Sequence, residues 1–257
     1  MEQKYELSFL IRELSLRHLS FEGTHFCDGA SQRRRGGFGF VVKGSDQLRT
    51  SGETIHLSEG SFFFLPRQKR YRSEWFGSPV IEYYMLHFTL AGAPFDFQPG
   101  KIEKMCGEKT LLRFRKIEEA LRSDSGPRAL ADAASLLADA AECLVPARPC
   151  PVHPALEKAE EFLRENLTKD FSVSELASAC FLSESRLYHL FREEWGVSPL
   201  QLLIEFRVER ALELLGEGTD DPARLLSETG FSSFSALKKA FQKKTGVTPA
   251  EYRRALL

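Results

Sequence analysis

A short pattern is written twice in the C-terminal part of this chain of 257 residues. The first copy runs from Leu176 to Pro199 and the second from Leu225 to Pro249, and each ends in Gly-Val-Ser-Pro or Gly-Val-Thr-Pro. The offset is 49 residues where Ser183 corresponds to Ser232 and 50 residues further on, which predicts one residue inserted early in the latter helix of the second copy. A repeat this regular predicts one supersecondary unit used twice.

Each copy predicts two short helices joined by a tight turn. Ser172 followed by Glu175 is a capping box that opens a helix at about Val173, Ser183 caps the next helix, and Gly196 ends it. In the second copy the first cap, the first helical position, the turn and the second cap fall on Asp221, Pro222, Gly230 and Ser232. This is the helix-turn-helix pattern, in which the second helix enters the DNA major groove by its N-terminal residues.

The segment 230–253, GFSSFSALKKAFQKKTGVTPAEYR, resembles the C-terminal signature of AraC/XylS-type transcription regulators. The resemblance extends over about 153–257 and covers both copies in order. It implies a sequence-specific regulator that binds double-stranded DNA as a homodimer, responds to a small-molecule effector and works with RNA polymerase.

The resemblance also implies roles for the polar residues of the two reading helices. In the first helix we expect Ser185, Tyr188 and His189 to read base edges beside the exposed Arg186, and Ser183 and Arg192 to contact phosphate. In the second helix the base-edge candidates are Ser235, Lys238 and Lys239, the phosphate candidates are Ser233 and Lys243, and Ser232 is the cap. The alternative is that these polar faces are only solvated surface.

The charge of the C-terminal part is not basic overall. Residues 153–257 contain 14 Lys and Arg against 17 Asp and Glu, while residues 1–152 contain 21 against 19. The charges are segregated, however, and the positive ones cluster at the second copy and the tail: Lys238, Lys239, Lys243, Lys244, Arg253 and Arg254. Because the local field decides groove binding, we expect modest affinity per subunit and a need for dimers.

The N-terminal part predicts an antiparallel β-barrel. Short segments with strand patterns recur at roughly ten-residue spacing, at 13–21, 38–42, 49–57, 61–65, 71–75 and 80–88. Residues 57–66 resemble the Gly-turn-strand-Pro segment of the cupin sensor domain common in this regulator family. The expected fold class is therefore α+β with two domains: an N-terminal antiparallel β-barrel (cupin-like jelly roll) with dimerisation helices, and a C-terminal all-α tandem helix-turn-helix domain.

We expect a barrel over 1–108, with an irregular arm at 1–10, then a helical dimerisation region over 109–145, a Pro-rich linker over 146–154 and the DNA-binding domain over 155–257. In the helical region, one stripe either pairs two copies of the chain or packs on the barrel, and the resemblance favours dimerisation. The stripe consists of Leu130, Ala133, Leu137, Ala141 and Leu144. A long helix from Ser198-Pro199 to about Leu215 joins the two copies and would hold the reading helices roughly one DNA turn apart.

The mouth of the barrel is the candidate ligand site. Alternation places Tyr83, Met85 and His87 on one face of the last strand, and the arginines that could reach the same mouth, with the neighbouring aromatic residue, are Arg33, Arg35, Arg70, Arg72 and Phe38. Relatives that respond to sugars hold the ligand with an Arg and aromatic residues at about these places, which implies a polar, sugar-like or sugar-acid effector. The alternative is that these arginines are solvated loop charges.

The sequence argues against an enzyme. A cupin metal centre needs an HxH pair, and here His56 and His87 are each isolated, so no cofactor is expected. The segment Gly36-Gly37-Phe38-Gly39 does not lead from a strand into a helix, so it is no dinucleotide fingerprint. We find no signal peptide, no apolar stretch of about 18–20 residues and no CxxC pair among five cysteines, and therefore expect a cytoplasmic protein with reduced thiols and no membrane contact.

Overall fold

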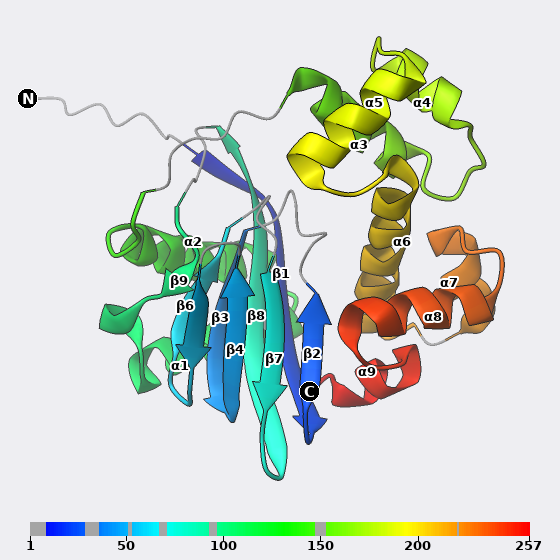
Figure 1. Cartoon of the computed structure of the whole chain (residues 1–257). Coiled ribbons are helices and arrows are strands. Elements are labelled where there is room, and N and C mark those ends of the chain that lie inside the picture. The colour runs from blue at the N-terminus through cyan, green and yellow to red at the C-terminus, as the bar shows by residue number, and fades with distance from the viewer. Residues whose placement is uncertain are drawn as a thin grey trace, which may run out of the picture. The chain divides into compact units, whose positions relative to one another are not determined.

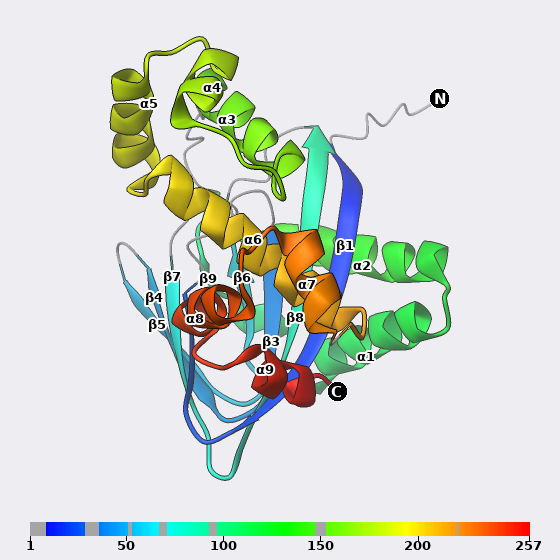
Figure 2. The same ribbon diagram turned by 90° about the vertical axis from the view of Figure 1, so that its right-hand side faces the viewer.

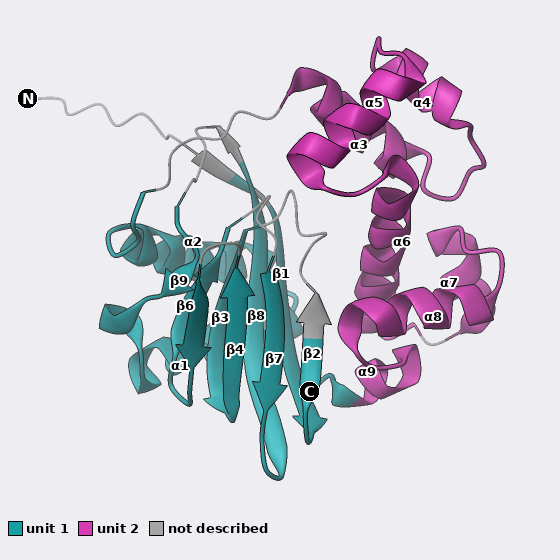
Figure 3. Cartoon of the chain, viewed as in Figure 1, with its two compact units in different colours: residues 1–149, 255–257 teal, residues 150–254 magenta. Residues whose placement is uncertain are grey.

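The computed structural model describes residues 9–28, 36–50, 53–66, 71–92, 97–146, 153–219 and 221–257. The chain forms two compact units, one of residues 1–149 with 255–257 and one of residues 150–254 (Figure 3). Residues 1–8 of the arm expected over 1–10 lie outside the described residues, as do the ligand candidates Arg33, Arg35 and Arg70, whereas Phe9 and Leu10 begin a strand and are not irregular.

The N-terminal unit contains two antiparallel sheets (Figure 1). The order in the larger sheet is β1 (Phe9–Glu22), β8 (Val80–Gly92), β3 (Gly36–Lys43), β6 (Phe62–Leu65) and β9 (Gly100–Lys101). The order in the smaller sheet is β2 (His25–Asp28), β7 (Tyr71–Phe76), β4 (Ser45–Thr50) and β5 (Thr54–Leu57). The predicted fold class is confirmed, although the described strands form two separate sheets and not one closed barrel.

One strand prediction was wrong, and one strand was missed. The segment 49–57 is not one strand: β4 and β5 pair with each other, with Arg49 opposite Thr54 and Asp46 opposite Leu57. Ser51-Gly52, between them, is the turn signal that the single-strand reading passed over. The strand β2 was not predicted, because four residues are too few to show an alternating pattern.

The helices α1 (Glu108–Arg122) and α2 (Gly126–Ala141) cover one face of the larger sheet (Figures 1 and 2). Their buried residues form one apolar core with the phenylalanines of that face. Ala133 and Leu137 of the predicted pairing stripe are fully buried in this core, so at these two positions the stripe packs on the sheet. Leu130 is 42% exposed.

Strand β8 is buried on both faces. Tyr84, Leu86 and Phe88 point to the helices, whereas the residues between them are buried on the opposite face. Because β8 lies between two layers, its sequence is a nearly continuous apolar run and does not alternate with polar residues.

The C-terminal unit is built from helices. They are α3 (Pro154–Glu165), α4 (Val173–Ala179), α5 (Glu184–Leu190), the π-helical turn η2 (Phe191–Trp195), α6 (Pro199–Gly216), α7 (Pro222–Thr229), α8 (Phe234–Thr245) and α9 (Pro249–Ala255). In Figure 2, α6 runs from the group α3–α5 to the pair α7 and α8. The predicted linker ends earlier than expected, because His153 caps α3 and Pro154 is its first residue. Helix α2 likewise ends at Ala141, before the predicted Val145.

The predicted helix caps of the repeat are confirmed with one exception. Ser172 and Glu175 form the capping box of α4, and Ser183 caps α5. Ser233, not Ser232, caps α8, and its hydroxyl accepts a hydrogen bond from the backbone N–H of Ala236. The left-handed turn residues Phe181 and Gly230 are 49 residues apart, whereas the caps Ser183 and Ser233 are 50 apart, so the extra residue of the second copy lies between the turn and the cap of α8.

Candidate nucleic-acid interface

The first reading helix, α5, presents a polar face. Leu187 and Leu190 are buried in the core of the first half, so the side chains between them turn outward. Tyr188 is 40% exposed. The remaining predicted residues of this face are also exposed: Ser183, Ser185, Arg186, His189 and Arg192.

Acidic groups surround the C-terminal end of this face. His189 Nδ1 lies 2.9 Å from a carboxylate oxygen of Glu193, and both side chains are more than half exposed. Glu193, Glu194 and Arg192 lie together in η2, which ends at Gly196 in the left-handed conformation. The N-terminal end of α5 is therefore the part of this helix best suited to approach DNA.

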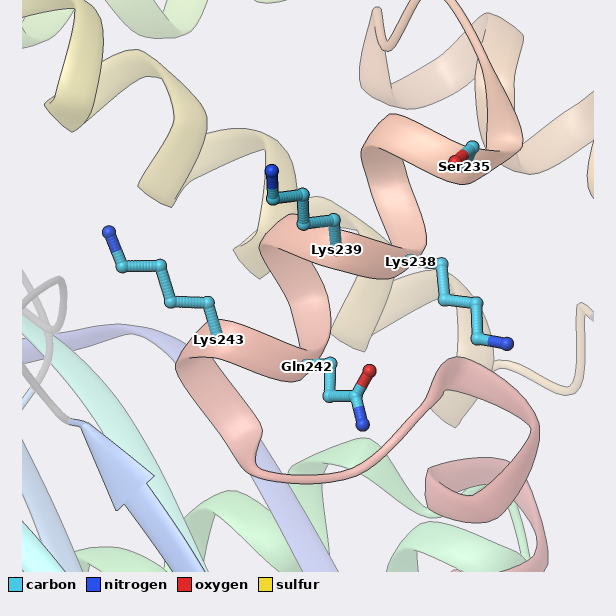
Figure 4. A pocket seen from close by; sticks show the side chains of 5 residues that line it. All are labelled: Ser235, Lys238, Lys239, Gln242 and Lys243. Carbon is cyan, nitrogen blue, oxygen red and sulfur yellow. The ribbon is translucent and has the colours of Figure 1, made fainter.

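The second reading helix, α8, presents a basic face. Leu237 and Phe241 are buried, and five exposed side chains line an open concave surface of about 400 Å³ (Figure 4). They are Ser235, Lys238, Lys239, Gln242 and Lys243. The predicted residues Ser232 and Ser233 are exposed at the start of the helix.

Gln242 belongs to this face but was missed by sequence reasoning. Ser235, Lys238, Lys239 and Gln242 stand at i, i+3, i+4 and i+7, which is the spacing of one helix face. A glutamine amide donates and accepts hydrogen bonds, and it matches the adenine edge in the major groove. The periodicity alone was enough to find it.

A carboxylate limits the positive field near α8. Glu251 on α9 accepts hydrogen bonds from the backbone N–H and the hydroxyl of Thr248 at 2.7 and 2.8 Å, which hold the pKa of Glu251 below its usual range. Lys238 and Arg254 lower this pKa further through their charges.

In the N-terminal unit, the candidate ligand residues are divided between two faces of the larger sheet. Tyr83, on the face toward the smaller sheet, stacks on Trp75 with ring centroids 4.1 Å apart. Met85 and His87 are buried on the same face as Tyr83, next to Gly37. Phe38 lies on the opposite face, packed with the helices α1 and α2, and therefore cannot line the same pocket as Tyr83.

Arg72 is exposed on β7 and lies 3.5 Å from a carboxylate oxygen of Glu74. Its guanidinium is also 5.7 Å from the ring centre of Phe26. Among the described residues, it is the arginine of the predicted ligand set that the structure places.

His25 and Asp46 are buried in the smaller sheet, and burial shifts the pKa of each. Burial lowers the pKa of His25 to about 4. Burial raises the pKa of Asp46 to about 7, and the neighbouring Ser73 and the backbone of Glu74 offset only part of this shift. The described part of the chain contains no cluster of three His, Cys, Asp or Glu that could hold a metal ion. It also contains no helix of the length and apolarity needed to cross a membrane.

Residues 176–255 match the family model described as a helix-turn-helix domain. The matched segment begins in α4 and ends in α9, and therefore includes both reading helices.

Several relatives match about two fifths of this chain. A probable transcriptional regulator LumQ of Photobacterium leiognathi is 32% identical over 94 residues, which cover 37% of this chain and 38% of that protein. A putative AraC-like transcription regulator of Streptomyces antibioticus is 35% identical over 101 residues, covering 39% and 33%. The arabinose operon regulatory protein of Escherichia coli is 30% identical over 107 residues, covering 40% and 37%. The chain thus spans less than two fifths of the length of these relatives.

The whole chain is similar in fold to ToxT of Vibrio cholerae. A crystal structure of ToxT with a bound unsaturated fatty acid gives a TM-score of 0.67 at 14% identity, covering 99% of this chain and 98% of ToxT. A second ToxT structure, from strain O395, gives a TM-score of 0.66 at 13% identity, covering 98% and 99%. The chain therefore contains a helix-turn-helix domain over residues 176–255 that is similar to those of AraC-like regulators, and its fold is like that of ToxT.

Proposed function

We propose that this protein is a transcription regulator that binds double-stranded DNA through α5 and α8. The observation that carries the proposal is the pair of reading helices in one domain, each with its apolar side buried and its polar side exposed. The match of residues 176–255 to a helix-turn-helix family model and the names of the similar relatives support it.

The two faces would read different DNA. The hydroxyl, phenol and imidazole of Ser185, Tyr188 and His189 can each donate or accept hydrogen bonds at base edges. Lys238 and Lys239 carry donors only, which suit the acceptors O6 and N7 of guanine. Ser183 and Arg192 in the first half, and Ser233 and Lys243 in the second, would contact phosphates. The recognised site would therefore be asymmetric.

Selection of random DNA fragments by the purified full-length chain tests this function. We expect an asymmetric site with two conserved blocks, and a steep loss of affinity with rising salt. Fragments with no common sequence, or with one block only, would contradict the proposal.

We further propose that the working species is a homodimer in the cytoplasm, able to contact RNA polymerase. In the N-terminal unit, Leu112, Leu121 and Leu130 are 47%, 37% and 42% exposed on α1 and α2, which supports an interface there. Light scattering of the protein and of a Leu112→Glu/Leu130→Glu variant checks it: the variant should be monomeric. A monomeric parent protein would contradict the dimer.

The N-terminal unit would sense a small molecule between its two sheets. Trp75 and Tyr83, which are buried and stacked on each other, would form the aromatic wall of this site, and the arginines of the predicted set would bind an acidic group. The fatty acid of the ToxT structure favours a second class, an apolar carboxylate.

Calorimetry separates the effector classes. The protein is titrated with sugars, sugar acids and unsaturated fatty acids, and then the Arg33→Ala, Arg72→Ala and Tyr83→Phe variants with any binder. A sugar acid should lose affinity in the arginine variants, and a neutral sugar mainly in Tyr83→Phe. If none of these compounds binds and none changes the affinity for DNA, the N-terminal unit serves dimerisation and does not sense a small molecule.

A further inference from the structure

Helix α6 belongs to both halves of the DNA-binding unit. It has 18 residues, so it is about 27 Å long. Leu202, Leu203 and Phe206 are buried in the core of the first half, with α3, α4 and α5. The buried residues of α6 from Val208 onward, such as Leu212, lie in its C-terminal part, and α6 also contacts α7 and α8 of the second half. The change from one half to the other falls at Arg207.

Arg207 contacts both halves. Its Nε donates a hydrogen bond to the carbonyl oxygen of Leu167 at 2.9 Å, in the loop that follows α3. Its guanidinium carbon lies 6.0 Å from the ring centre of Phe231, in the turn between α7 and α8. Asp170, in the same loop as Leu167, adds a favourable charge.

The two halves also approach each other directly beside Arg207. A Cβ atom on Gly230 would lie 2.5 Å from the carbonyl oxygen of Leu167 and 2.7 Å from Cα of Thr168. It would lie 3.2 Å from a terminal nitrogen of Arg207. The backbone of the first half thus lies against the turn of the second half, and glycine at 230 makes this possible.

The neighbouring arginines have more local contacts. Arg164 connects α3 to α6 through Glu209, at 3.4 Å, and lies 4.0 Å from the ring centre of Phe206. Arg210 connects α6 to α7 through Glu228. These contacts fasten α6 to the first half and to the second half separately, whereas Arg207 touches both.

We propose that Arg207 is a positioning residue for DNA binding, which fixes the orientation of α5 relative to α8 by joining Leu167 to the turn at Gly230. The inference rests on the proposed function, since it matters only if both helices read one duplex. Long helices curve to differing degrees, so the separate packing of each half on α6 does not by itself set one orientation between the reading helices. The contact at the middle of α6 removes this freedom, and the domain then selects one spacing between the two halves of its site.

Binding to DNA with altered spacing tests the proposal. The DNA is the fragment selected by the full-length protein, with none, one or two base pairs inserted between its two blocks. We expect two inserted base pairs to weaken binding by the parent protein on the order of 10²-fold, because the second half then no longer binds in place. In Arg207→Met, which keeps most of the apolar stem of the side chain, the same insertion should weaken DNA binding roughly tenfold or less.

The response to spacing separates positioning from simple instability. A variant that is only less folded would lose the same factor on every DNA. Arg224→Met is the matched control, since Arg224 pairs with Glu228 within α7 at 2.7 Å and should respond to spacing as the parent does. An Arg207→Met protein with the spacing response of the parent would overturn the proposal.

A distance measurement without DNA tests the positioning role of Arg207 independently of the proposed DNA binding. Spin-labelled amino acids at the exposed positions 184 and 242 report the distance between α5 and α8. We expect one narrow distance distribution in the parent protein and in Arg224→Met, and a broad one in Arg207→Met. An unchanged narrow distribution in Arg207→Met would overturn the positioning role, whether or not the protein selects DNA.

Discussion

The two halves of the C-terminal unit share a fold and differ in charge. Each has a short helix, a turn with a left-handed residue, and a reading helix capped by a serine. The segment 184–195 of the first half holds two arginines and three glutamates, whereas the segment 234–245 of the second holds four lysines and no acidic residue. If the proposed function holds, the second half would supply most of the electrostatic affinity for DNA, and the first half would contribute mainly through hydrogen bonds.

The turns differ as well. Phe181 and Gly230 occupy corresponding positions, and both are left-handed, with φ of 57° and 73°. The Phe181 side chain is 82% exposed, while Gly230 lies against the loop of the other half. The same backbone turn is thus free in one half and packed in the other, which explains why glycine is required in only one of them.

The largest expected effect follows from the difference in charge. Changing Lys238, Lys239 and Lys243 together to Gln should weaken DNA binding on the order of 10²-fold and make the salt dependence shallower by about 3 in log–log slope. Changing Arg186 and Arg192 to Gln should alter that slope by about 2 or less, because Glu193 and Glu194 already reduce the field there. Titrations by fluorescence anisotropy at several salt concentrations measure both.

The control removes the same charge from the other unit. A Lys104→Gln/Lys109→Gln/Lys116→Gln protein has the same net charge as the triple lysine variant of α8, and these three residues are exposed in the N-terminal unit. It should keep the affinity and the slope of the parent. Equal losses in the two triple variants would mean that net charge, and not the face of α8, controls binding.

The second prediction concerns the packed turn. Gly230→Ala should cost about 2–4 kcal/mol of stability in the C-terminal unit, because the left-handed backbone and the close contact with Leu167 both oppose a Cβ atom. Gly218→Ala is the control, since Gly218 is left-handed but its Cβ would meet nothing nearer than 3.7 Å, so about 1 kcal/mol is expected.

Urea unfolding followed by the fluorescence of Trp195, in a Trp75→Phe background, measures these changes. Equal costs for Gly230→Ala and Gly218→Ala would contradict the close packing of the two halves.

The third prediction tests the common architecture. Ser183→Ala and Ser233→Ala each remove a hydroxyl that accepts a hydrogen bond from the third residue beyond it, so each should cost about 1 kcal/mol. Ser232→Ala should cost less than 0.5 kcal/mol, roughly the range of ordinary surface substitutions. The same unfolding measurement applies. A larger loss of stability in Ser232→Ala than in Ser233→Ala would show that Ser232 caps α8, as the sequence predicted.

The smallest effect is expected at the free turn. Phe181→Gly relieves the strain of the left-handed backbone, which stabilises the folded state. It also removes the contact of the ring with Lys158 Nζ at 4.4 Å and raises the conformational entropy of the unfolded chain, which both oppose this gain. The net increase in the free energy of unfolding should be about 0.5 kcal/mol. Phe181→Ala keeps the strain and loses the contact, and should therefore give no gain. A gain from Phe181→Ala equal to that from Phe181→Gly would show that the exposed ring, and not the backbone, is the unfavourable part.

The repeat was predictable because local signals agree with the fold. Ser172, Ser183, Asp221 and Ser198 all cap the helices expected of them, since a cap depends on a few neighbouring residues. The cap at Ser232 failed because two serines stand side by side there, and only the helix start decides between them.

The N-terminal unit was harder to predict, because its contacts are distant in sequence. The buried positions Ala133 and Leu137 show a helical stripe equally compatible with a partner chain or with the sheet, and only the three-dimensional structure decides. Phe38 was assigned to the ligand pocket by its place near the arginines. Its pairing with Leu86 puts it on the face of the helices instead.

Chemical footprinting of the parent protein on its selected DNA shows whether α5 and α8 occupy two grooves of one duplex. We expect two protected major-groove patches on one face of the duplex, with centres about 10–10.5 base pairs apart. Lysine changes in α8 should remove one patch, and changes at Ser185 and Tyr188 in α5 should remove the other. A single protected patch, removed by changes in either helix, would contradict a domain that reads two grooves at once.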